Sequence, residues 1–178
     1  DNISAASHVP PVHTKTWFHT GIYLGMDRVS RQFEHEYFRE PGLTIETARP
    51  FLLDDTIVPP DLTLDEEREA CRALKGSMLR QEVYADDAGP LATPEEIRRA
   101  CTPYTVTEQN FAIRTLQRRG DNQHAVFFTH AREAISYNYE RNSADPRIQH
   151  SITLEVDDFG NVLKQAAIGY GRRKLIRV

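Results

Sequence analysis

Phe111-Ala112-Ile113-Arg114-Thr115-Leu116 decides the fold, because its β-branched and aromatic residues fall at the spacing of a strand. Five further runs of this kind also lie after Cys101, at 104–107, 125–128, 135–139, 152–156 and 162–163. Clusters of turn-forming residues separate several of the runs, at 120–122, 142–146 and 158–161. Links this short leave no room for the crossover helices that parallel strands need. The pattern therefore predicts an antiparallel meander.

The N-terminal half combines an extended stretch with capped helices. Residues 13–24 predict a strand with a bend at Gly21. Thr63-Leu64-Asp65-Glu66 has the form of a capping box, so a helix is expected to start there and to turn Cys71 toward the core. A second box at the start of residues 93–100 predicts a shorter helix, inserted between strands.

Two further helices are expected between these elements. From Val29 on, an apolar residue at every fourth position predicts a helix that Asp27 caps and that ends before Pro41. Thr44 can cap another helix, which Pro50 keeps brief or kinked because it lacks a donor and clashes one turn back.

Together the patterns predict a β-rich α+β fold, with the meander in the C-terminal half and a few short helices in the N-terminal half. The 178 residues are about one domain long. We expect a lead-in segment at residues 1–12, a single module at residues 13–173 and the start of a following segment at residues 174–178. The first residue is not Met and the last three are strand-like, which indicates a piece of a longer protein.

Composition argues against several classes of protein. The formal charge of −4 gives no overall field for a polyanion, so generic nucleic-acid binding is not expected. The local basic cluster, Arg172, Arg173, Lys174 and Arg177, is interpreted as a solvated strand face. No apolar run approaches the roughly 18 to 20 residues that cross a bilayer, and no signal peptide is visible. Cys71 and Cys101 lack the spacing of a zinc site or a disulfide framework, and Cys71 is expected to be a buried structural thiol.

The histidines and paired aspartates are the first candidates for catalysis or metal binding. His13 with His19 and His124 with His130 are six residues apart, a separation of about 20 Å along a strand and too long for one ion. Structural roles are therefore expected, with the second pair flanking Phe127-Phe128 at strand ends. A metal-dependent hydrolase that uses His124, His130 and an Asp remains an alternative.

Adjacent aspartates on an extended chain point to opposite faces and cannot converge on one substrate atom. A solvated loop explains the pair 54–55, and turn chemistry explains the pairs 86–87 and 157–158. The sequence contains no Gly-x-Ser-x-Gly elbow and no Gly-rich phosphate loop. No catalytic, cofactor-binding or metal-binding residue is predicted.

Aromatic residues leave a second alternative open. Trp17, Phe18, Tyr137 and Tyr139 could form a platform for carbohydrate, or could be core and cross-strand residues. On the first interpretation the protein is a module that binds carbohydrate or protein on a target surface.

Several longer strings of the sequence resemble the central region of the B component of bacterial insecticidal toxin complexes, the Tc toxins. They agree in order and spacing from about Val9 to Arg173, and comprise residues 13–21, 36–43, 52–56, 66–84, 103–111, 124–130, 154–163 and 169–173. Residues 88–100 and Pro50 depart from the pattern.

The resemblance implies a non-enzymatic structural module. With its C partner, the B component looks like a hollow shell of Rhs-type (YD-repeat) β-hairpins that holds a toxic polypeptide before delivery through a channel-forming A component. The chain would lie between the β-propeller and the Rhs repeats of the B component. Its implied partners are the rest of that chain, the C component with its toxic region and, indirectly, the A component. Neither nucleic acid nor direct membrane insertion is implied.

A secreted, extracellular toxin assembly follows from the same resemblance. No catalytic residue carries over, because the known protease and poison activities belong to the C partner.

Overall fold

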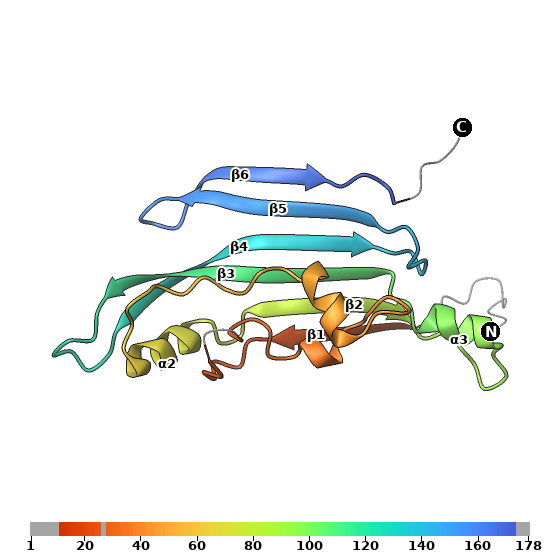
Figure 1. Ribbon diagram of the computed structural model, residues 1–178, viewed down its shortest axis with the longest axis horizontal. Helices are drawn as coiled ribbons and strands as arrows, with labels where there is room; N and C mark the ends of the chain where they lie inside the picture. Colours follow the sequence, from red (N-terminus) through yellow and green to blue (C-terminus); the bar gives the residue numbers. More distant parts are fainter. Residues whose placement is uncertain (1–10, 26–27, 174–178) are drawn as a thin grey trace, which may run out of the picture.

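A computed structural model describes residues 11–25 and 28–173, and a six-stranded antiparallel sheet dominates it (Figure 1). The strands lie side by side in the order in which they occur in the chain. They are β1 (Val12–Phe18), β2 (Met78–Ala85), β3 (Thr105–Gln117), β4 (Val126–Asn138), β5 (Arg147–Val156) and β6 (Val162–Gly169). The predicted β-rich α+β class and the antiparallel meander are confirmed.

Two strands are longer than the sequence patterns indicated. The runs 104–107 and 111–116 join into β3, and the runs 125–128 and 135–139 join into β4. The ladder between them shifts at Asn110/Phe111. Such a bulge changes which residues face the core, so it breaks the regular period without ending the strand.

Local chemistry sets the β5–β6 turn. Asp157 accepts hydrogen bonds from the backbone N–H groups of Phe159 and Asn161, both at 2.8 Å. Gly160 has φ of 92°, and a Cβ there would lie 3.0 Å from the Phe128 ring. Both the conformation and the close approach therefore require glycine.

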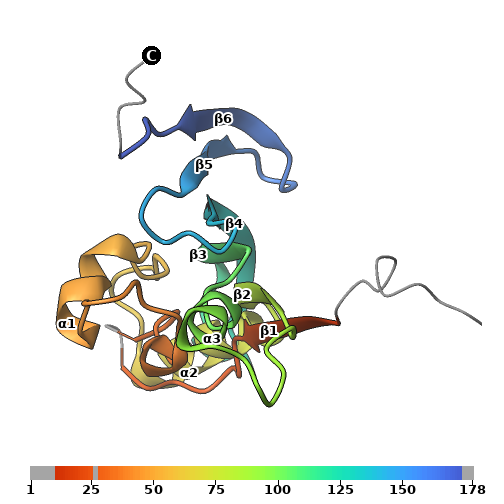
Figure 2. The same cartoon turned by 90° about the vertical axis from the view of Figure 1, so that its right-hand side faces the viewer.

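Short helices and coil from Arg28 to Leu74 form what we call the cover layer, which lies against one face of β1–β4 (Figure 2). Its elements are the 3₁₀ turns η2 (Glu34–Glu36) and η3 (Arg49–Phe51) and the helices α1 (Ile45–Ala48) and α2 (Leu64–Ala73). α3 (Pro94–Ala100) lies between β2 and β3, as predicted. The capping boxes at Thr63 and Thr93 are both present.

The predicted helix around Val29 is wrong, because only the three-residue turn η2 forms there. Asp55 binds the backbone N–H groups of Val29 at 2.9 Å and Ser30 at 2.6 Å, and so fixes the start of this segment to a distant part of the cover layer. Asp27 lies outside the described residues. The extended stretch is also shorter than expected, since β1 ends at Phe18 before the positive-φ bend at Gly21.

The core has two parts, both beneath the cover layer. Around α2, Cys71 and Leu74 pack with Leu79, Phe111 and Ile113. Farther along the sheet, Leu53 packs with Val106, Ile135, Tyr137 and Tyr139. No helix of the described residues covers β5 or β6, which extend beyond the cover layer in both views (Figures 1 and 2).

Candidate functional site

The most unusual feature of the interior is a buried ionic cluster between the sheet and the cover layer. Arg80 on β2 lies opposite Glu108 on β3, and Glu82 is two residues further along β2. The Arg80 guanidinium donates from Nε to Glu82 and from Nη1 to Glu108, both at 2.7 Å. The exposed fractions of these side chains are 5%, 1% and 9%. Charged side chains thus occupy strand positions that face the core.

Each carboxylate also holds the backbone of the cover layer. Glu82 accepts from the N–H of Phe38 at 2.8 Å, and Glu108 accepts from the N–H of Leu53 at 2.8 Å. The Tyr84 hydroxyl donates to the second oxygen of Glu82 at 2.5 Å. The cluster therefore joins two coil segments to the sheet where regular secondary structure cannot satisfy their donors.

Burial and charge act in opposite directions on this cluster. Burial raises the pKa of Glu108 above its ordinary value, and the neighbouring Arg80 opposes that rise. Burial, followed by the Glu82 carboxylate, raises the pKa of Tyr84. The Tyr37 ring lies 4.7 Å from the guanidinium carbon of Arg80 and screens it further from water. Because each charge of the cluster is bonded within the protein, we interpret the cluster as a structural link between the cover layer and the sheet.

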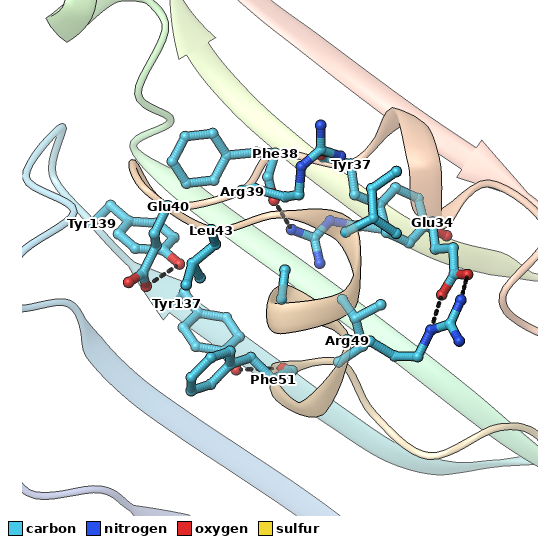
Figure 3. A pocket seen from close by; sticks show the side chains of 14 residues that line it. Glu34, Tyr37, Phe38, Arg39, Glu40, Leu43, Arg49, Phe51, Tyr137 and Tyr139 are labelled. Atoms are coloured by element: carbon cyan, nitrogen blue, oxygen red, sulfur yellow. Dashed lines mark hydrogen bonds and ion pairs between the residues drawn. The ribbon is translucent and has the colours of Figure 1, made fainter.

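A small cavity lies above this cluster, between the cover layer and β4 (Figure 3). Its volume is about 40 Å³, which is room for a few water molecules only. At its wall the Tyr139 hydroxyl donates to Glu40 at 3.0 Å, and the Tyr137 hydroxyl donates to the carbonyl of Phe51 at 3.0 Å. Arg49 and Glu34 close the far side as an ion pair. The cavity is a gap in the packing between the cover layer and β4, and it is too small for an organic substrate.

A wider groove of about 420 Å³ opens beside it, over β4 and β5. Glu133 lies 3.0 Å from Nε2 of His150, and the Tyr170 hydroxyl lies 3.1 Å from Nδ1 of the same ring. Asn110 bonds Glu133 in turn, at 3.2 Å. This chain of groups is the nearest approach to a reactive arrangement in the described residues. Both ring nitrogens of His150 already have partners within the protein, so we interpret the chain as a link between β4, β5 and the segment after β6.

Members of both candidate histidine pairs lie in separate contacts within the protein. His19 is buried, and its Nδ1 accepts from the N–H of Gly21 at 2.9 Å. His124 precedes β4 and bonds Glu69 of α2 at 2.8 Å. His130 lies in the interior of β4, so its prediction as a strand-end residue is wrong. The described residues contain no group of three His, Cys, Asp or Glu side chains that could hold a metal ion.

Two of the aspartate pairs also differ from expectation. Asp55 is not a solvated loop residue but binds the backbone of Val29 and Ser30. Asp87 is not a turn residue but makes a two-point ion pair with Arg141, at 2.6 and 2.8 Å. The turn role predicted for Asp157 is confirmed.

The four aromatic candidates do not share an exposed surface. Tyr137 and Tyr139 are buried and stack with 5.8 Å between ring centroids. Trp17 on β1 packs edge-on against Tyr37 instead, at 5.2 Å between ring centroids.

The basic cluster is not a free solvated face. Arg172 binds Asp145 at 2.9 Å, and Arg173 makes two contacts to Glu40, at 2.6 and 2.9 Å. Lys174 and Arg177 lie outside the described residues.

Cys71 is buried in the core as predicted, whereas Cys101 is exposed. Burial raises the pKa of Cys71 to about 11, so almost none of it is thiolate at pH 8. We expect Ellman's reagent to modify one thiol of the native protein quickly and the second only after unfolding. Fast reaction of both thiols in native protein would contradict this, and Cys101→Ser identifies the fast one.

The comparison with protein families decides the assignment. The family described as the insecticide toxin TcdB middle/C-terminal region matches residues 69–178, which is more than half of the chain. The chain belongs to this family. No curated protein sequence matches it.

Solved structures of TcdB2 complexes are similar to this member of the TcdB family over almost its whole length. A crystal structure of TcdB2–TccC3 matches with a TM-score of 0.73 and 29% identity over 100% of this chain. A TcdB2–TccC3–Cdc42 structure gives 0.72 and 29% over 98%, and a Photorhabdus luminescens Tc holotoxin pore gives 0.69 and 29% over 95%. The chain spans only 7% to 8% of those chains. None of the helices among the described residues is long and apolar enough to cross a membrane.

Proposed function

We propose that this TcdB-family chain is a non-enzymatic wall module of a toxin complex. It contributes one stretch of β-sheet to the B component of a shell that encloses a toxic polypeptide before translocation. Residues 13–173 act as a single module in this proposal. The partners are the rest of the B component and the C component, with the channel-forming A component as an indirect partner and a secreted assembly as the setting.

The open edge of the sheet is the observation that carries the proposal. β6 pairs with β5 on one side only, and no described residue pairs with its other side. Natural edge strands are usually protected by prolines or free charges, because unpaired N–H and C=O groups recruit further strands. β6 contains no proline, and its single charge, Lys164, forms an ion pair with Glu155 of β5.

Exposed apolar side chains beside that edge support the same proposal. Leu163 on β6 is 57% exposed, and Phe159 in the β5–β6 turn is 89% exposed. Such side chains suit a sheet that continues into a neighbouring part of the shell, where they would be covered.

Ala167→Pro tests whether the edge pairs. Tyr170 donates its N–H to the carbonyl of Ile148 on β5, so the alternation of an antiparallel ladder turns the N–H of Ala167 away from β5. Proline there leaves the β5–β6 ladder intact and removes a donor from the open edge. We expect the isolated chain to self-associate at high concentration, and the variant to do so about tenfold more weakly by analytical ultracentrifugation.

Ala167→Val is the matched control, since it keeps the N–H and favours a strand. Its association should equal or exceed that of the parent chain. A parent chain that stays monomeric at high concentration, or a proline variant that associates as strongly as the parent, would rule out pairing at the β6 edge. In the full B and C complex, the proline variant should also expose the enclosed polypeptide to added protease.

A further inference from the structure

The face of the sheet opposite the cover layer carries few charged side chains. Successive strand residues alternate between faces, so the neighbours of the buried Glu82, Glu108 and Tyr137 point away from the cover layer. We call the resulting surface the open face. One row of cross-strand partners runs over all six strands: Thr16, Gln81, Thr107, Ser136, Gln149 and Gly169. The flanking rows contribute Thr14, Val83, Thr105, Asn138, Gln109, Ala134, Ser151, Ala167, Thr153 and Gln165.

The few charged side chains of the open face are paired within the protein. Arg132 of β4, the neighbour of the buried Glu133, forms an ion pair with it at 3.0 Å. Arg147, at the start of β5, forms an ion pair with Glu140. Arg114, beyond the bulge in β3, binds Asp158 at 3.0 Å. The whole chain is 27% charged, and about the same fraction is usual for a surface that faces water. The fraction of charged side chains on the open face is therefore lower than in the whole chain and lower than on an ordinary solvent-facing sheet.

Polar groups on the open face bond one another. Gln81 donates to the Thr16 hydroxyl at 3.2 Å, and the hydroxyls of Thr107 and Ser136 lie 3.3 Å apart. Ala134, Ser136 and Ser151 are among the small residues that line a shallow hollow of about 410 Å³. Most side chains in the middle of the open face are thus small or uncharged, and the aromatic ring of Phe128 lies toward one end, where Arg114 stacks on it.

Chemistry of this kind suits contact with an unfolded polypeptide that must later leave. An unfolded chain presents charges of both signs together with apolar side chains. A charged wall would hold its oppositely charged segments, and an apolar wall would gain about 25 cal/mol for each Å² of apolar surface it covered. A wall of mostly small, uncharged side chains, whose few charges are paired within the protein, holds neither kind of segment tightly.

We propose that the open face lines the inside of the shell and lies against the enclosed toxic polypeptide without recognising its sequence. The cover layer then lies on the outer side of the wall. This rests on the proposed shell function and adds which face of the sheet meets the cargo.

A pair of cysteine variants on opposite faces tests the assignment in the full B and C complex. Ser136→Cys places a near-isosteric thiol on the open face, and Glu46→Cys places one on exposed α1 of the cover layer, each in a Cys101→Ser background. The probes are a polymer-tethered maleimide, with labelled peptides located by mass spectrometry, and a thiol-attached benzophenone for photo-crosslinking. In the intact complex we expect the thiol of Ser136→Cys to label at least about tenfold more slowly than after disassembly, because the reagent cannot reach it.

The benzophenone on the open face should crosslink to the enclosed polypeptide, and the thiol on α1 should label equally fast before and after disassembly. Fast labelling of Ser136→Cys in a complex whose cargo resists protease would overturn the face assignment and leave the shell standing. Slow labelling with crosslinks only to the B or C wall would overturn it too, since another wall segment would then cover the face. Fast labelling on both faces with protease-sensitive cargo would instead refute the shell function itself.

Discussion

Arg80→Met is expected to destabilise the fold by about 3–5 kcal/mol, because it leaves two buried carboxylates without their cation. In the folded protein the side chains of Glu82 and Glu108 are shielded from solvent, with exposed fractions of 1% and 9%. The variant must therefore protonate them or open the cover layer to water. Chemical denaturation followed by tryptophan fluorescence measures the loss, since Trp17 packs on Tyr37 close to the cluster.

Replacing the whole charge set distinguishes a lost ion pair from lost packing. In the triple variant Arg80→Met/Glu82→Gln/Glu108→Gln, the amide oxygens can still accept from the backbone N–H groups of Phe38 and Leu53. We expect the triple variant to recover at least about half of the stability lost in the single variant, as in other buried ionic clusters replaced together. A triple variant as unstable as Arg80→Met would show that packing of the arginine stem, and not charge, dominates at this position.

Elements that depend on neighbouring residues could be predicted from the sequence. Thr63 and Glu66 lie three residues apart and form their capping box as expected. The Asp157 turn follows equally from its own residues. The strand runs and their antiparallel order follow from the period of two and from the short links.

Features that depend on distant residues could not be predicted. Val29 carries helical spacing, yet the segment forms coil, and its N–H bonds Asp55, 26 residues away. Arg80 and Glu108 lie on the same face of the sheet as the buried Tyr84 and Val106, and the register places them opposite each other beneath the distant residues of the cover layer. The one sequence signal was an arginine and a glutamate at alternate positions of a strand rich in apolar residues. The Glu133–His150 link was missed for the same reason, since it joins different strands.

Glu66→Gln is the second change with a large expected effect, because one carboxylate joins α2 to the β3–β4 hairpin. Glu66 accepts from the N–H of Thr63 at 2.9 Å, from the N–H of Arg119 at 2.9 Å and from Nε of Arg118 at 3.0 Å. An amide has a single acceptor oxygen, so glutamine can satisfy Thr63 or Arg119 but not both. We expect the Tm to fall by about 5 °C or more in calorimetry at pH 7.

The difference in Tm between wild type and Glu66→Gln should depend on pH. Hydrogen bonds from the backbone of Thr63 and Arg119 lower the pKa of Glu66 to about 2, from an ordinary value of 4.5. A depressed pKa in the folded state contributes stability that is complete above the unfolded value and is lost as the pH falls toward the folded value. The Tm difference between wild type and Glu66→Gln should therefore be constant above about pH 6 and shrink between pH 4.5 and pH 2.

Glu96→Gln separates the capping box from the link to the hairpin. Glu96 occupies the same position in the Thr93 capping box of α3, and bonds to Thr93 lower its pKa too, but among the described residues its side chain bonds Thr93 alone. If the link to Arg118 and Arg119 provides most of the effect, Glu96→Gln should change the Tm by a small fraction of what Glu66→Gln does. Equal losses from both variants would mean that capping alone explains the result, and that the hairpin tip is held by other contacts such as Glu69 with His124.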